Sequence, residues 1–171
     1  TDNLYASDFN PDMGYETHEN NRSMRFMQLL PVNEKINYHE FKRIKFDRQL
    51  PQQLAYSTKT DTLFLLNAND YPELSNVINT LQKWDKAATI NSEGATILSV
   101  IFYYVVDKLM KGDASFKTLT KEKTVEVYRF ANDYLLKYFG TVSVPLGDYQ
   151  KLVRGKKAIP LSGLPDVIAS M

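Results

Sequence analysis

The stretch that decides the fold class is Gly94–Met110, with the sequence GATILSVIFYYVVDKLM. Its apolar side chains would fall on nearly every side of a helix, whereas a helix at a protein surface keeps a polar face. We therefore expect this helix in the centre of a helical bundle. Asn91 or Ser92 precedes it as a cap, and the apolar run at 100–106 is much too short to span a bilayer.

Two amphipathic patterns lie on either side of this helix and would pack against it. Asp70-Tyr71-Pro72 opens the first, because proline suits the first helical turn. The second begins at Thr120 and ends before Gly140, a residue typical of helix C-termini. Their predicted apolar faces are Leu74, Val77, Ile78, Leu81 and Trp84 in the first helix, and Val127, Tyr128, Ala131, Tyr134, Leu135 and Tyr138 in the second.

The N-terminal part predicts an irregular segment followed by two short helices. Residues 1–21 are rich in Asp and Asn and show no apolar period, which is typical of loops. A helix is expected from about Arg22, capped by Asn20 or Asn21, until Pro31 ends it.

Asn37 and Glu40 form a capping-box pattern that opens the second helix. That helix would run to about Asp47 and bury Phe41 and Ile44. Residues 51–62 suggest an extended connection, and the apolar run 63–66 fits either a turn of helix or a strand.

The pattern changes after Gly140. Residues 142–145 indicate a short extended segment and residues 146–148 a turn. Because this tail has no core of its own, it must lie on another surface. We therefore divide the chain into an irregular N-terminal loop (1–21), a helical domain (22–140) and an extended tail that begins a returning β segment (141–171).

Composition restricts the function classes. The chain has 171 residues, of which 43% are hydrophobic and 12% aromatic, so a folded domain with a real core is expected. The formal net charge is +1, with interspersed charges, which makes nucleic acid a poor first candidate as a partner. The absence of cysteine excludes disulfides and thiolate nucleophiles, and with two histidines a zinc site is not expected.

Few residues are candidates for chemistry. His18 and His39 fit surface positions better than a Ser-His-Asp arrangement. Residues 8–19 place Asp8, Asn10 and Asp12 at EF-hand positions, but Met13 stands where the loop requires glycine. A single carboxylate from this loop could still contribute to a calcium site built elsewhere, although solvated turn residues are the default interpretation.

Arg22 and Arg25 occupy the predicted first turn of a helix, where positive charge opposes the helix dipole. A partner carboxylate or a functional role would explain them. No glycine-rich phosphate loop is present, because Gly140, Gly147 and Gly155 do not have its spacing. The residues alone therefore predict a helical module with a docked tail and an incomplete reaction centre.

Three stretches together resemble the penicillin acylase family of N-terminal-nucleophile hydrolases. The first is Asn20–Leu30 with the segment 36–47, and the second is Leu81–Asp85, which resembles the family's "L..WD". The third, from Val144 to Val167, is similar to "VPWG…LRRG…PL.GGPDV" of the aculeacin and acyl-homoserine-lactone acylase branch. Leu146 replaces the branch's usual Trp, and Leu164 replaces a Gly.

The resemblance implies a fold, an activity and a set of partners. The chain would be the helical portion of the large (β) subunit, cut from an αββα hydrolase that cleaves linear amides. In the family, a precursor cleaves itself, and the new N-terminal Ser attacks the amide carbonyl with its own amine as base. The Ser and the oxyanion donors are expected upstream, so this chain alone would be inactive. Thr1 is a poor nucleophile candidate, since it precedes a polar loop and not a buried strand.

By the same resemblance, Arg22 aligns with an arginine near the oxyanion-hole Asn and would have a supporting catalytic role. Asp8, in "Y.ASD", aligns with a possible calcium ligand. The expected partners are the remainder of the acylase precursor and an acyl-amide small molecule, in a periplasmic or extracellular parent protein. The alternative is a non-catalytic helical interaction or scaffold domain.

Overall fold

The computed structural model describes residues 20–30, 35–54 and 62–164 of the chain. Across these ranges the protein is mainly helical, with one short two-stranded sheet near the C-terminal end, which confirms the expected fold class. None of the helices in these ranges is both long and apolar enough to cross a membrane.

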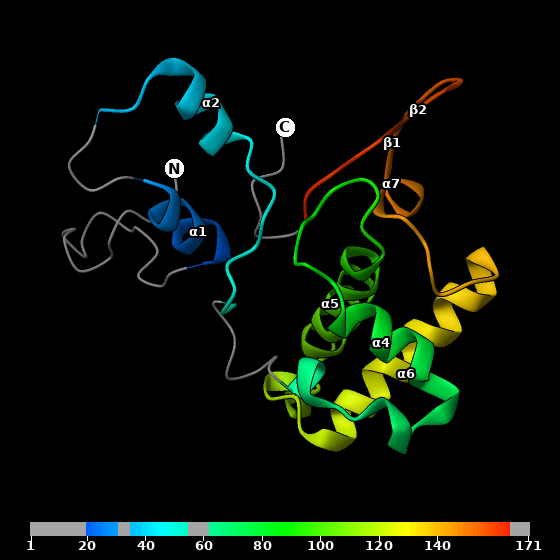
Figure 1. Ribbon diagram of the computed structural model, residues 1–171. Helices are drawn as coiled ribbons and strands as arrows, with labels where there is room; N and C mark the ends of the chain where they lie inside the picture. Colours follow the sequence, from blue (N-terminus) through cyan, green and yellow to red (C-terminus); the bar gives the residue numbers. More distant parts are fainter. Residues whose placement is uncertain (1–19, 31–34, 55–61, 165–171) are drawn as a thin grey trace.

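The elements follow the chain as helices interrupted by short 3-10 turns, and end in a β-hairpin (Figure 1). The first helices are α1 (Asn21–Leu29) and α2 (Tyr38–Lys45), and residues 62–65 form a single helical turn. The remaining helices and turns are η3 (Ala68–Asp70), η4 (Pro72–Leu74), α4 (Ser75–Gln82), α5 (Glu93–Met110), η5 (Ala114–Lys117), α6 (Lys121–Phe139) and α7 (Leu146–Tyr149). The strands are β1 (Lys151–Arg154) and β2 (Lys157–Pro160).

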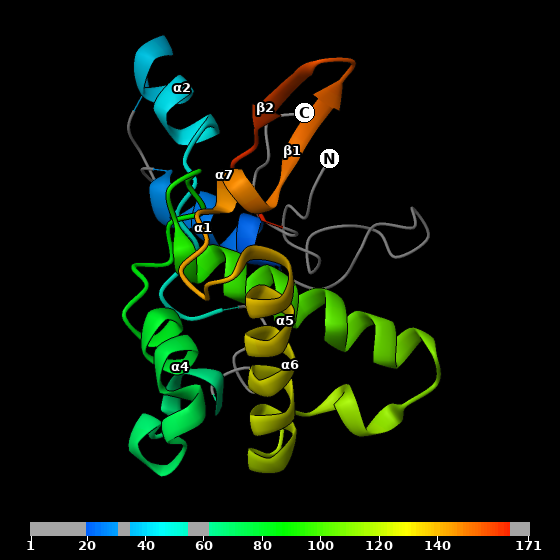
Figure 2. The ribbon, with the colours of Figure 1, turned by 90° about the vertical axis from the view of Figure 1, so that its right-hand side faces the viewer.

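The main core lies where α4, α5 and α6 meet, as the two views in Figures 1 and 2 show. Side chains from all three helices, and from residues 63–66 and η5, bury themselves there. The large side chains that are most fully buried in it are Leu63, Leu74, Ile78, Leu81, Ile97, Ile101, Phe116, Tyr128 and Leu135. Of the two alternatives for residues 63–66, a turn of helix or a strand, the structure shows the turn of helix. Leu63 lies in this turn and Leu66 directly follows it, and both side chains pack in the core.

The central helix α5 departs from its expected position along half its length. Its buried residues all lie between Gly94 and Ile101, whereas the apolar side chains beyond them are largely exposed. Figure 2 shows this second half extending past α6. The prediction of a bundle-centre helix is right for the first half and wrong for the second, where only Tyr104 and Val105 pack against the core of the described residues.

The helix ends agree well with the expected caps. The Thr120 hydroxyl accepts a hydrogen bond from the Lys123 amide at the start of α6, and Gly140 ends the helix with φ of 74°. Asn37 caps α2, but that helix ends at Lys45, earlier than expected. Ile44 is buried as predicted, whereas the prediction for Phe41 is wrong, since its side chain is 44% exposed on the outer face.

The tail is better ordered than its sequence suggested. Residues 146–149 form a short helix, α7, where a turn was expected. β1 and β2 then pair antiparallel, with Lys151 opposite Pro160 and Arg154 opposite Lys157. All eight strand residues are exposed, so the hairpin contributes no core of its own.

Candidate functional site

Arg22 lies in the first turn of α1, and a capping box fixes that turn. The Ser23 amide donates to the Asn20 side-chain oxygen at 2.8 Å, and the Asn20 amide donates to the Ser23 hydroxyl at 3.0 Å. Arg22 is half-buried, and the first turn contains no acidic residue. The structure thus gives Arg22 a defined backbone position, while its predicted supporting role stays a prediction.

Arg25, one turn further along α1, has a structural partner. Its Nε lies 2.7 Å from Oδ2 of Asp47, and the two side chains are only 28% and 20% exposed. This pair connects α1 to the segment that follows α2. Arg25 therefore has the partner carboxylate that its position predicted. This ion pair explains why a positive charge is tolerated early in a helix.

Of the other predicted site residues, His39 alone falls within the described ranges. Asp8 and His18 lie outside the described residues, so the calcium prediction stays a prediction. His39 is exposed on α2, where its ring contacts Tyr38 edge-on. Within the described ranges, no three His, Cys, Asp or Glu side chains are grouped so that they could hold a metal ion.

The second and third stretches that carried the resemblance meet at one loop, residues 84–92, which we call the junction loop. Trp84 donates from its indole N–H to the Ala87 carbonyl at 2.9 Å, and Asp85 accepts from the Ala87 amide at 2.9 Å. Trp84 also lies against Gly94, where an added Cβ would come within 2.3 Å of the Trp84 Cβ. The "WD" pair therefore shapes the loop and fits against the first turn of α5.

The tail docks on the other side of the same loop through backbone hydrogen bonds. The Gly147 amide donates to the Ile90 carbonyl at 2.8 Å, and the Gly163 amide donates to the Ala88 carbonyl at 2.8 Å. A Cβ on Gly147 would lie 2.8 Å from Cβ of Pro160. The surface that the tail needed is thus the junction loop, and a glycine is required at the closest approach.

The segment after α2 completes the junction. The Leu50 amide donates to the Lys86 carbonyl at 3.0 Å, and the Ala88 amide donates to the Arg48 carbonyl at 2.8 Å. A second, smaller core closes beneath these bonds, made of Leu50, Leu54, Ala88, Ala95, Leu146 and Leu164. Sequence analysis did not foresee this convergence, because the contributing segments lie far apart in the chain.

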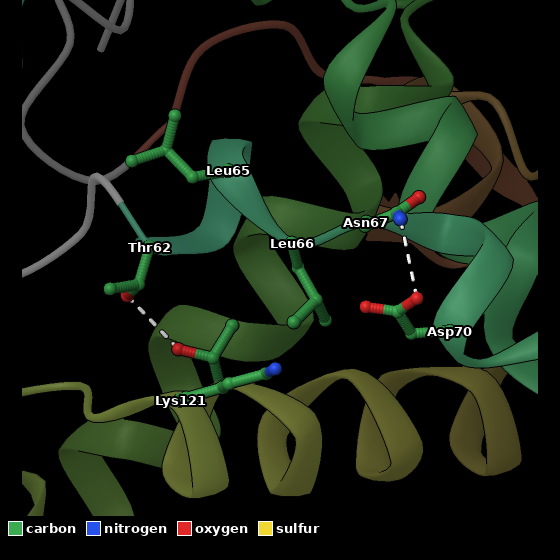
Figure 3. Close-up of a pocket in the computed structure, with 7 residues that line it drawn as sticks. Thr62, Leu65, Leu66, Asn67, Asp70 and Lys121 are labelled. Carbon is green, nitrogen blue, oxygen red and sulfur yellow. Dashed lines mark hydrogen bonds between the residues drawn. The ribbon is translucent and has the colours of Figure 1, made fainter.

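A pocket of about 330 Å³ lies between η3 and the start of α6 (Figure 3). Its polar groups are mostly bonded to one another: the Thr124 hydroxyl donates to that of Thr62 at 2.9 Å, and Asn67 donates to Asp70 at 3.2 Å. Asp70 and Lys121 are its charged lining residues. The Thr62 and Thr124 hydroxyls also donate to the backbone carbonyls of Leu119 and Thr120. They are therefore not hydrogen-bonded to Asp70 or Lys121, as an activated nucleophile would be to its base.

The clearest pKa shifts belong to core tyrosines. Burial raises the pKa of Tyr128, whose hydroxyl donates to the Leu63 carbonyl at 2.5 Å. Burial, with Tyr134 and Tyr103 nearby, raises the pKa of Tyr149 to about 12. Both shifts keep the phenols neutral at ordinary pH, which fits packing side chains and not general acids or bases poised near neutrality.

Comparison with known proteins gives one assignment. The family model described as penicillin amidase matches residues 2–151, a range that includes α1, the junction loop and α7. A search of curated proteins found no significant match. The family match covers most of the chain, so it applies to the helical body and not to one motif.

Proposed function

This chain belongs to the penicillin amidase family, and from that premise we propose that it is the helical part of the large subunit of an acylase hydrolysing linear amide bonds. The observation that carries the proposal is the family match over residues 2–151, which includes the fixed first turn of α1. The parent's nucleophilic Ser and oxyanion donors would then come from the polypeptide upstream. The aculeacin and acyl-homoserine-lactone acylase branch remains our proposed subfamily, on the residues from Val144 to Val167.

Arg22 is the residue of this chain that we assign to the reaction, in a supporting role beside the oxyanion-hole Asn. Support comes from the rigidity of its helix. The Asn20 cap fixes the first turn, and the Arg25–Asp47 pair anchors the next. A guanidinium on such a support can stabilise negative charge that develops on a carbonyl oxygen.

The test compares two arginines on the same helix in the full-length, self-processed protein. Arg22→Ala should lower kcat/KM for a chromogenic linear acyl amide by at least about tenfold. Arg25→Ala is the matched control, because its partner is structural: it should lower the melting temperature slightly and leave kcat nearly intact. Equal, small effects of both substitutions on kcat would remove Arg22 from the reaction.

A wider test addresses the activity itself. Mass spectrometry of the expressed precursor should reveal two subunits, the larger beginning with Ser, and substitution of that Ser by Ala should leave one unprocessed chain. The 171-residue chain assayed alone should show no amidase activity. An unprocessed, inactive wild-type parent would instead support the non-catalytic scaffold alternative.

The remaining assignments follow from the same proposal. The partners would be the small subunit and the rest of the large subunit, and the parent would act in the periplasm or outside the cell. Asp8 would be a calcium ligand. Calcium titration of wild type and Asp8→Asn, followed by thermal unfolding, tests that assignment: a calcium-dependent stabilisation should disappear in the variant.

A further inference from the structure

An apolar groove runs along the second half of α5, on the side that faces η5. Its volume is about 270 Å³, larger than the cavity of about 150 Å³ that accepts a benzene ring in an engineered protein core. Nine apolar side chains and one charged one line it, namely Leu63, Leu98, Ile101, Phe102, Val105, Val106, Leu109, Phe116, Leu119 and Lys117. Such a lining, with a single polar feature, is typical of a ligand site.

The groove is long and follows a helix, which restricts the shape of an occupant. Six of its lining residues, from Leu98 to Leu109, recur at the three- and four-residue spacing of one helix face. At 1.5 Å per residue this stripe is roughly 16 Å long. Phe102, Val106 and Leu109 along it are 36–40% exposed. An extended chain could cover this stripe along its whole length, whereas a compact ring system would leave part of it open to water.

The charge of the groove is positive and unopposed. Lys117 is its one charged lining residue and forms no ion pair within the described ranges. By contrast, the nearby Lys123 ammonium is held by Glu126 at 2.8 Å, so it is already neutralised. Lys108, whose ammonium lies 5.9 Å from the centre of the lining Phe116 ring, is a second cation beside the groove. An apolar groove lined by the cation Lys117 complements an apolar chain that ends in an anion.

We propose that this groove binds a free long-chain carboxylate, with the chain along the α5 stripe and the carboxylate at Lys117. Burial of the exposed apolar side chains drives the binding, at about 25 cal/mol for each Å² of apolar surface removed from water. The ammonium selects the anionic head over a neutral one. The proposal is independent of the amide hydrolysis proposed above, because α1 with Arg22 lies apart from the η5 end of α5 in both views (Figures 1 and 2).

Isothermal titration with dodecanoate, below the concentration at which it forms micelles, tests the proposal on the protein as it stands. We expect saturable binding at one site, and weaker binding of dodecanol. Lys117→Met should weaken dodecanoate binding by up to about fivefold, the most that one exposed ion pair contributes. It should leave dodecanol binding unchanged. Val106→Glu, which places a negative charge on the stripe, should abolish binding of dodecanoate.

Controls separate the groove from general effects of charge and folding. Lys156→Met removes an exposed cation from the turn of the β-hairpin and should leave dodecanoate binding intact. Circular dichroism and thermal unfolding confirm that each variant is folded. These measurements detect binding and not catalysis, so they can succeed or fail whatever the outcome for Arg22.

Several results would overturn the proposal. Absence of dodecanoate binding means that the groove is filled by another part of the chain or by nothing. A dimer that Val106→Glu dissociates means that a second copy covers the groove. Equal affinity for dodecanol, or no effect of Lys117→Met, removes the role of the cation. Binding only to anionic vesicles assigns the surface to a membrane instead.

Discussion

The two halves of α5 are both rich in apolar residues, but the first half is buried and the second is largely exposed to solvent. From Gly94 to Ile101 the helix is buried against α4, α6 and the junction loop, whereas from Phe102 to Met110 most of its apolar side chains are exposed. Hydrophobicity along the sequence is therefore a poor guide to where this helix is covered. What differs is the reach of its neighbours, and apolar surface that no neighbour covers is available to a ligand or partner.

Different forces hold the two halves. The first half is fixed by tight contacts, with Trp84 directly against Gly94. The second half is held largely by rings and charges: Tyr104 stacks on Phe130 with 4.0 Å between ring centroids, and the Lys108 ammonium lies 5.9 Å from the centre of the Phe116 ring. Such contacts contribute about 0.5–1.5 kcal/mol each, so we expect the second half to open more easily.

Truncating one side chain in each half should give the largest difference. Ile97 is fully buried, so Ile97→Ala should lower the free energy of unfolding by about 3 kcal/mol, through lost burial and the cavity left behind. Leu109 is 38% exposed, so Leu109→Ala should cost less than about 1 kcal/mol. Urea unfolding followed by circular dichroism measures both.

Equal costs for the two substitutions would contradict this view of α5. If Leu109→Ala proved as damaging as Ile97→Ala, the second half would be covered in solution. A second copy would then be the first explanation, and the mass from light scattering would identify it. The matched chemistry of the two changes, each a branched aliphatic residue to Ala, makes the comparison direct.

Adding a methyl group at Gly94 should have the next largest effect. Gly94 lies in the first turn of α5, so the gain from Gly→Ala is at most the value of about 1 kcal/mol for a helix interior. Here the new Cβ would lie 2.3 Å from Cβ and 2.4 Å from Cγ of Trp84, and overpacking of a core costs about 1–3 kcal/mol or more. We expect the clash to win, with a net loss of about 2 kcal/mol in thermal or urea unfolding.

A double variant shows whether Trp84 is the cause. Gly94→Ala combined with Trp84→Gly should be less destabilised than the sum of the two single variants, because the Cβ and Cγ atoms that the new methyl group would meet are then absent. An increase in stability for Gly94→Ala alone would mean that the junction loop moves aside easily. That result would also weaken the contrast between the two halves of α5.

The sequence predicted most helices because their signals are local. Thr120 and Gly140 mark the ends of α6, and the pattern from Asn20 to Ser23 opens α1. Phe41 was predicted to be buried because its spacing from Ile44 fits one apolar face. Its exposure depends on which surface α2 meets, and that information is not local.

The site was less predictable than the fold, for the same reason. Arg25 and Asp47 could be suspected of pairing only in general terms, since 22 residues separate them. The junction loop draws on segments up to 115 residues apart in the chain, from Arg48 to Gly163, so periodicity and capping could not identify it. The resemblance highlighted Trp84 and Gly147, but only the structure shows that Trp84 bonds within this loop and that Gly147 lies against Ile90 of the same loop.

The smallest effect should come from the polar contacts of the second half of α5. Tyr104 donates to Glu126 at 2.9 Å, and Lys123 lies 2.8 Å from the other carboxylate oxygen. The hydrogen bond from Lys123, followed by that from Tyr104, lowers the pKa of Glu126 below its ordinary value of 4.5. A lowered carboxyl pKa stabilises the fold above 4.5, and this stabilisation is lost as the pH falls through the folded-state pKa.

Glu126→Gln should therefore be slightly less stable than wild type near neutral pH and should match it in acid, once Glu126 is protonated. Thermal unfolding of both proteins across pH 3 to 7 measures the difference, roughly the range in which carboxylates titrate. Glu73, whose contact with Arg129 is longer at 3.7 Å and well exposed, offers the control: near neutral pH, Glu73→Gln should lower the melting temperature by less than Glu126→Gln. If the melting temperature of Glu126→Gln stayed below that of wild type at every pH, the charge of the Glu126 carboxylate would not be what connects the second half of α5 to α6.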